Sequence, residues 1–160
     1  MSGLFEGLAL RLTRRFAAPR EEVFDGWTDP RVLRRWWAAR PSWDSPSTEV
    51  DLRVGGRYRL PMRDTDSGAA RTVTGEYREI RRPERLACTW SWDDSSGQMR
   101  GSHQMLVVDF LDDRDSTNVV LTHRGFADPQ IRDLHAHGWQ GYLDDLARRV
   151  LERVQSPAPE

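Results

Sequence analysis

The sequence predicts an α+β fold in which a curved, seven-stranded antiparallel sheet packs against one long C-terminal helix, with two short helices after the first strand. Apolar and polar residues alternate in short stretches between residues 8 and 123, which is typical of strands with one buried face. Two proline-led segments with helical spacing interrupt this pattern near residues 19 and 30. A helical stripe then runs from Ile131 to Val150, and strands followed by one amphipathic helix favour a helix lying across the sheet.

The first strand and the two short helices are predicted within residues 8–37. Alternation over residues 8–16 indicates the strand. Pro19 opens the first helix. Asp29 and Pro30 then provide the N-cap and the first residue of the second helix. Residues 38–47, rich in proline and serine, are expected to form a loop.

Six further strands and the long helix complete the predicted order. The strands are expected over residues 50–54, 57–63, 73–77, 86–92, 102–110 and 119–123. Gly55-Gly56 provides a tight turn, and residues 64–70, 93–97 and 112–116 are expected to form turns and loops. Asp128-Pro129 begins the final helix. We assign a single domain to residues 1–154 and a terminal tail to residues 155–160.

Composition indicates a folded chain with a real core. The chain has 160 residues, of which 38% are hydrophobic, and it contains seven Trp, five Phe and three Tyr. Disordered chains are poor in aromatic residues, so this content argues against disorder. The length suits one domain.

Charge and cysteine content exclude several classes of function. The net charge of -1 gives no strong field of one sign, which argues against a nucleic-acid binder. Every basic residue is arginine, so catalysis by a lysine is excluded. Cys88 is the single cysteine, which excludes an internal disulfide and a cysteine-based zinc site. No signal-peptide pattern and no apolar run of ~18 residues occur, so we predict a cytoplasmic protein without a membrane partner.

Large aromatic side chains gather on the predicted inner faces. Strand parity directs them toward the helix, where they either fill the core or form the wall of a pocket for a flat, lipophilic ligand. Trp36 and Trp37 are adjacent, so we expect one to face inward and the other outward or toward the loop. The predicted ligand-binding residues are Trp36, Trp43, Tyr58, Tyr77, Trp90, Trp92, Gln104, Phe110, His123 and Trp139.

Two of these residues are polar on otherwise apolar faces. Gln104 and His123 either make structural hydrogen bonds or orient a ligand, because a buried amide or imidazole needs a partner. His123 is also the candidate for a general acid or base, although it lies near a strand end and could be at the surface.

The remaining polar residues give no catalytic motif. His135 and His137 diverge on a helix and cannot chelate one metal ion, so we predict neither a metal nor a cofactor. His103 has outward parity, and Asp144 and Asp145 are expected to face solvent. Arginines at 57, 59 and 63 line an outer strand face, but interspersed acids argue against an anion-binding patch.

Several segments together resemble the bacterial single-domain branch of the Hsp90-ATPase-activator-like proteins, within the START-like, helix-grip superfamily. They are FAAPREEVFDGWTDPRVLRRWW, VDLRVGGRYRLPM, TGEYREIRRPERLACTWSW and LTHRGF followed by GW, and the likeness covers about residues 8–151. The resemblance implies a seven-stranded sheet around the C-terminal helix with a cavity between them. The superfamily includes lipid carriers, cyclases, co-chaperone domains and self-sacrificing resistance proteins.

Four hypotheses of function follow. The first is binding of a lipophilic or aromatic small molecule between sheet and helix, by a monomer or a homodimer. The second is a resistance protein that sequesters a reactive natural product such as an enediyne, with a loop glycine such as Gly97 or Gly101 as its target. The third is a cyclase- or hydrolase-like enzyme that uses His123, and the fourth is a module that binds a chaperone.

Overall fold

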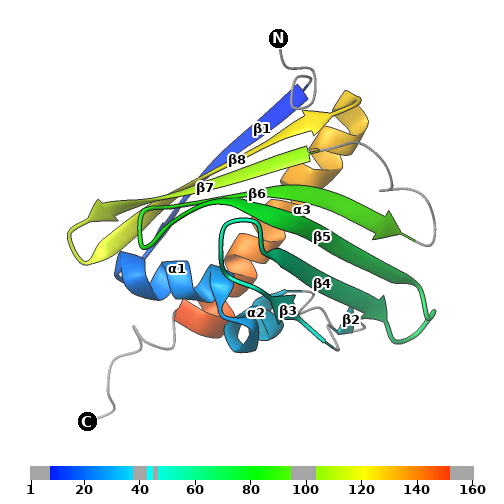
Figure 1. Ribbon diagram of the computed structural model, residues 1–160, viewed down its shortest axis with the longest axis horizontal. Helices are drawn as coiled ribbons and strands as arrows, with labels where there is room; N and C mark the ends of the chain where they lie inside the picture. The colour runs from blue at the N-terminus through cyan, green and yellow to red at the C-terminus, as the bar shows by residue number, and fades with distance from the viewer. Residues whose placement is uncertain (1–7, 38–42, 45–46, 95–103, 152–160) are drawn as a thin grey trace.

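The antiparallel sheet curves around the long C-terminal helix, as the computed structural model shows (Figure 1). The structure describes residues 8–37, 43–44, 47–94 and 104–151. The strands are β1 (Leu8–Phe16), β2 (Trp43–Asp44), β3 (Glu49–Val50), β4 (Arg57–Asp64), β5 (Ala70–Arg81), β6 (Arg85–Asp94), β7 (Gln104–Asp113) and β8 (Ser116–Phe126). The helices are α1 (Arg20–Thr28), α2 (Pro30–Trp36) and α3 (Pro129–Leu146), and α3 continues into a π-helical turn, η1 (Ala147–Leu151).

The strand order confirms the predicted fold class. The sheet runs β1-β8-β7-β6-β5-β4-β2, with β3 also paired to β4, and every pairing is antiparallel. Six strands are long and two, β2 and β3, have two residues each. Asp93-Asp94 and Asp112-Asp113, predicted in turns, instead extend the ends of β6 and β7.

The strand predicted over residues 50–54 shortens to β3 because the following backbone folds into a compact turn. Leu52 and Val54 are 43% and 65% exposed, so their apolar alternation marks no buried face. The turn is hydrogen bonded to β5, since the backbone N–H of Gly55 donates to the carbonyl of Tyr77 over 2.8 Å. Gly55 has a φ of 87°, a conformation that glycine adopts without strain.

Local signals set the helix starts where the sequence predicts them. The carboxylate of Asp29 accepts a hydrogen bond from the backbone N–H of Arg31, and Pro30 follows as the first residue of α2. In the same way, the carboxylate of Asp128 accepts from the N–H of Ile131 at the start of α3. Both predicted helix starts are confirmed.

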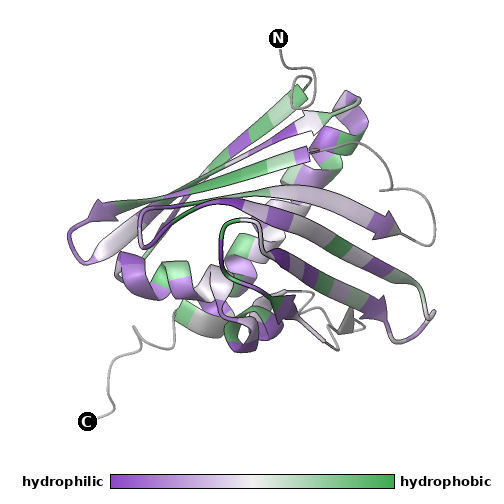
Figure 2. Ribbon diagram, viewed as in Figure 1, coloured by the Kyte–Doolittle hydropathy of each residue, from purple (hydrophilic) through white to green (hydrophobic). Residues whose placement is uncertain are grey.

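The core lies between the concave face of the sheet and the helices. α3 packs against β1 and β8, α1 packs against β7 and β8, and α2 packs against α3 and η1. Hydrophilic and hydrophobic residues alternate along β4 and β5 in Figure 2, as expected for strands with one buried face. Within the described ranges, no helix has the length and apolar character needed to cross a membrane.

Candidate functional site

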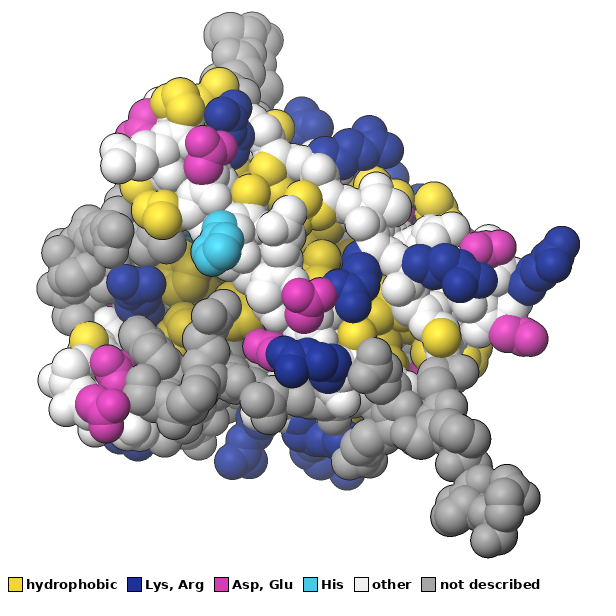
Figure 3. All heavy atoms as spheres, turned by 180° about the vertical axis from the view of Figure 1, so that it is seen from behind, with side chains coloured by type: hydrophobic (Ala, Val, Ile, Leu, Met, Phe, Trp, Pro, Cys, Tyr) yellow, Lys and Arg dark blue, Asp and Glu magenta, His cyan; other side chains and the backbone are white. Residues whose placement is uncertain are grey.

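A cleft of about 280 Å³ opens between the middle of α3 and strands β4, β5 and β6. Figure 3 shows hydrophobic side chains at the floor of a hollow on this face, with a histidine beside them. The described residues that line the cleft are Met62, Arg71, Trp90, Trp92, Leu134, His135, His137, Gly138, Trp139 and Tyr142.

Two periodicities bring this lining together. Trp90 and Trp92 lie two residues apart on β6 and therefore point to the same face of the sheet. On α3, the lining residues His135, Trp139 and Tyr142 follow spacings of four and three, which place them along one side of the helix. The cleft is thus formed where the inner face of the sheet meets one stripe of α3.

A second, inner cavity of about 30 Å³ lies deeper in the core. Trp90 and Trp139 line both the cleft and this inner cavity, so their rings separate the two spaces. The other described residues around the inner cavity are Trp27, Leu33, Trp36, Trp37, Tyr58, Leu60, Tyr77, Leu86, Cys88 and Leu106. Its volume is roughly that of one water molecule in the liquid.

His123 is fully buried and hydrogen bonded through both ring nitrogens. The indole N–H of Trp139 donates to Nδ1 of His123 over 3.0 Å. An indole can only donate, so the imidazole proton is on Nε2, which lies 2.8 Å from Oε1 of Gln104 and donates to it. Burial is the main cause that lowers the pKa of His123 well below its usual range, and the neighbouring His135 adds to the effect.

His135 forms the equivalent arrangement on the cleft side. Its Nε2 accepts from the indole N–H of Trp92 over 2.8 Å, so the proton is on Nδ1, which donates to the carbonyl of Ile131 over 2.9 Å. Burial lowers the pKa of His135 as well. The rings of His123 and His135 meet edge to face at 5.2 Å, which makes a pair of neutral imidazoles inside an aromatic cluster.

Tyr58 shows how a glycine creates space for a ring. The Tyr58 hydroxyl donates to the carbonyl of Thr89 over 2.5 Å, and the Cys88 thiol donates to that hydroxyl over 3.6 Å. A Cβ at Gly75, on the neighbouring strand, would lie 2.5 Å from the Tyr58 ring. Burial raises the pKa of Tyr58, and it raises the pKa of the Cys88 thiol to about 12.

Residues 17–150 match the family described as Activator of Hsp90 ATPase homolog 1-like protein, AHSA1. The chain belongs to this family. Among solved structures, a protein of Chromobacterium violaceum is 26% identical, covers 90% of this chain and 97% of its own, and has a TM-score of 0.78. The AHSA1 protein of Silicibacter pomeroyi is also 26% identical, with 88% and 95% covered and a TM-score of 0.75. CalU16 of Micromonospora echinospora, at 22% identity, 92% and 78% coverage and a TM-score of 0.68, shows the same fold. No curated protein matches the sequence.

In this AHSA1-like chain the predicted site residues lie in three different places. Trp90, Trp92 and Trp139 line the cleft. Trp36, Tyr58 and Tyr77 line the inner cavity instead. The remaining described ones, Gln104, Phe110 and His123, are buried and line neither space.

Several predictions fall on parts of the AHSA1-like chain that the structure does not describe. The side chain of Trp43, which belongs to β2, is outside the described residues. Gly97, Gly101 and His103 also lie outside them.

Two predictions about individual side chains are wrong. Trp36 and Trp37 are both buried, because α2 ends at Trp36 and the extended backbone at Trp37 turns the second ring inward as well. Asp145, expected to face solvent, is 6% exposed and accepts a hydrogen bond from Arg148 over 2.9 Å. For His123 the sequence left both a core and a surface position open, and its side chain is in the core, on the face that its parity indicates.

Sequence reasoning missed part of the cleft, although the signals were present. Met62 and Tyr142 continue the inner parity of β4 and the apolar stripe of α3. Arg71 has the same parity as Val73 on β5, so one further step along the strand places it at the cleft. Leu134 is exposed at the rim but lies on the predicted apolar stripe of α3, whereas no pattern distinguishes His137 from surface residues.

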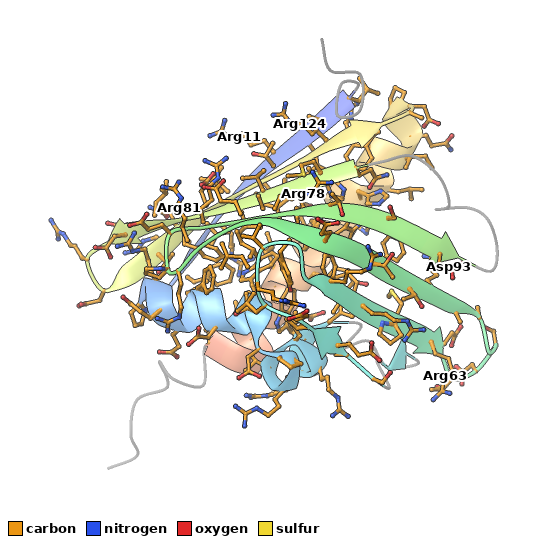
Figure 4. All side chains as sticks on the ribbon, viewed as in Figure 1. Arg11, Arg63, Arg78, Arg81, Asp93 and Arg124 are labelled. Atoms are coloured by element: carbon orange, nitrogen blue, oxygen red, sulfur yellow. The ribbon has the colours of Figure 1, made fainter. Side chains whose placement is uncertain are left out.

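The outer face of the sheet is mixed in charge. Arg11, Arg78, Arg81 and Arg124 are exposed and point away from the interior (Figure 4). Arg81 pairs with Glu79 over 2.8 Å, so arginines there alternate with acids. Among the described side chains, no group of histidine, cysteine and acidic residues is arranged to hold a metal ion.

Proposed function

We propose that this AHSA1-like protein binds a hydrophobic or aromatic small molecule in the cleft between the sheet and α3. The observation that carries the proposal is the 280 Å³ cleft with three tryptophans in its wall. Small-molecule sites are concave and mostly apolar, with few polar groups, and begin at roughly 300 Å³. The cleft fits a ligand of two or three fused rings at the small end of that range.

The wall favours a flat ligand over a flexible chain. Trp90 contacts Trp92 and Trp139 with ring centroids 5.9 and 5.2 Å apart, so the wall is a continuous aromatic surface. Aromatic rings gain most from stacked or edge-to-face contacts with other rings. The polar side chains of Arg71 and His137 are part of the lining and suit a polar substituent on the ligand.

Gly138 allows the cleft to be filled without disturbing the fold. A Cβ built at this glycine has no atom within 4 Å, and its residue lines the cleft. A Gly138→Leu side chain therefore extends into the cleft itself. Gly138→Ala adds one methyl group at the same position and serves as the matched control, because both changes also raise helix propensity.

The test is a thermal-shift screen of flat polyketides, flavonoids and fatty acids against wild type and both variants. A ligand at about 100 times its Kd stabilises the native state by ~2.7 kcal/mol. At ~2–4 °C per kcal/mol, this raises the Tm of wild type and Gly138→Ala by several degrees. We expect Gly138→Leu to lose most of this shift. A shift of equal size in Gly138→Leu, or no shift with any compound in wild type, would contradict the proposal.

The position of His123 bears on the enzymatic hypothesis. Both of its ring nitrogens are engaged, and it lines neither the cleft nor the inner cavity. This favours a structural role for His123 over proton transfer to a ligand. The resistance hypothesis, through Gly97 or Gly101, and the chaperone hypothesis stay predictions.

A further inference from the structure

Three buried tryptophans around the inner cavity carry indole N–H groups without a hydrogen-bond partner. Among the described residues, the unsatisfied buried donors include Nε1 of Trp27, Trp37 and Trp90. These side chains are 6%, 2% and 3% exposed, and all three line the inner cavity. Buried N–H groups are paired in the great majority of cases, because leaving one unpaired costs about 1–3 kcal/mol.

The rings of these three tryptophans all contact the ring of Trp139. Trp27, Trp37 and Trp90 contact Trp139 with centroid distances of 5.6, 6.4 and 5.2 Å, and Trp37 contacts Trp90 at 5.8 Å. The other tryptophans of this cluster already use their N–H groups. Trp36 donates to the carbonyl of Gly26 over 2.8 Å, while Trp92 and Trp139 donate to histidines.

The chemistry of the inner cavity selects a neutral acceptor. An indole N–H donates and cannot accept, so the complementary group must carry lone pairs. No charged side chain among the described residues lines this cavity, so a carboxylate would lose its hydration without gaining a counter-charge. A carbonyl oxygen accepts two hydrogen bonds and has no proton of its own that needs an acceptor.

Trp90 is the ring that controls access from the cleft. It and Trp139 form the boundary between cleft and inner cavity. Trp139 is held by its hydrogen bond to His123, whereas the N–H of Trp90 has no partner in the protein. Packing alone therefore fixes the orientation of the Trp90 ring.

We propose that the ligand is an aromatic ketone whose rings lie in the cleft and whose carbonyl oxygen passes Trp90 into the inner cavity, where it accepts hydrogen bonds from Trp37 and Trp90. This inference rests on the proposed function and adds the chemical class of the ligand. The cavity of about 30 Å³ has room for one oxygen but not for a ring. The rings must therefore stay in the larger cleft.

The probes are 9-fluorenone and fluorene, which share a flat tricyclic shape and differ by a carbonyl in place of a methylene group. Titration calorimetry measures both affinities for wild type, Trp37→Phe and Trp36→Phe. Trp36 and Trp37 are adjacent, buried and line the inner cavity but not the cleft, and only Trp37 has an unpartnered N–H. The two substitutions thus remove the same ring atoms and differ in the donor that the ligand would use.

We expect wild type and Trp36→Phe to prefer fluorenone about tenfold, the equivalent of ~1.4 kcal/mol, and Trp37→Phe, which keeps only the Trp90 donor, to show a clearly smaller preference. Equal affinities in wild type, or an undiminished preference in Trp37→Phe, would overturn the carbonyl inference and leave the proposed function standing. Binding of neither probe would overturn the aromatic-ketone inference, while the thermal-shift screen decides the proposed function. If Trp37→Phe does not fold, the infrared carbonyl stretch of fluorenone bound to wild type decides. A shift to lower frequency supports the hydrogen bonds, and an unshifted band overturns them.

Discussion

Acidification is expected to destabilise the folded protein through its two buried histidines. The neutral imidazoles of His123 and His135 each accept a hydrogen bond from a tryptophan, and burial lowers the pKa of both below the ordinary value of 6.5. The unfolded chain therefore binds protons at these sites at a higher pH than the folded chain does. Stability is highest above pH 6.5 and is lost as the pH falls from there toward the folded-state pKa values.

The number of protons sets the size of the effect. Each proton bound by the unfolded chain and not by the folded chain changes the free energy of unfolding by ~1.4 kcal/mol per pH unit. With His123 alone the slope approaches that value, and with His135 as well it approaches ~2.7 kcal/mol per pH unit. The free energy of unfolding therefore changes most steeply in the part of the pH range where both histidines are protonated only in the unfolded chain.

Urea unfolding at a series of pH values from about 7.5 to about 5 measures this slope, because the range lies above the usual pKa of carboxyl groups. His135→Gln keeps an oxygen that can accept from Trp92 and removes one titrating group, so the limiting slope should fall by about half. His137→Gln, at an exposed histidine of the same helix, is the matched control. A flat profile in wild type, or an unchanged slope in His135→Gln, would refute the reasoning.

Two further predictions concern buried groups away from the histidines. Gly75→Ala would drive a methyl group into the backbone carbonyl of Thr89 and the ring of Tyr58. We therefore expect urea unfolding to show a free energy of unfolding that is lower by about 1–3 kcal/mol or more. An unaffected midpoint would show that the strands can separate there. Burial raises the pKa of the Cys88 thiol to about 12, so it should resist labelling by a disulfide reagent at pH 8 and react fully in denaturant. Rapid labelling of the native protein would contradict the burial.

Local sequence patterns predicted the parts of the fold that depend on neighbours in the chain. The caps Asp29 and Asp128 bind backbone N–H groups two and three residues away, so the sequence contains the whole interaction. The inward direction of Trp90 and Trp92 follows from the two-residue period of a strand, which no distant contact can alter without a bulge.

The candidate site was less predictable because its decisive contacts join distant residues. Trp92 and His135 are 43 residues apart, and their hydrogen bond depends on how α3 crosses β6. The alternation of Leu52 and Val54 failed for a related reason, since hydrogen bonds between the turn that contains them and β5 decide their exposure. Parity predicts which face a side chain takes, but not which partner it meets there.

The hydrogen bonds of the cleft wall suggest how rigidity and access are combined in this protein. Trp92 and Trp139 are each tied to a neutral histidine, and those histidines contact each other, so two of the three wall tryptophans belong to one connected network. Trp90 packs between them and is the wall tryptophan whose N–H has no partner within the described chain. The two hydrogen-bonded tryptophans form a fixed frame that can keep the shape of the cleft. The Trp90 ring, which no hydrogen bond holds, can let a ligand group reach the inner cavity. Protonation of the histidine pair in the folded protein would break the frame. Stability should therefore begin to fall below pH 6.5, where the unfolded chain binds protons, whereas ligand affinity should decline only as the pH approaches the lowered folded-state pKa values.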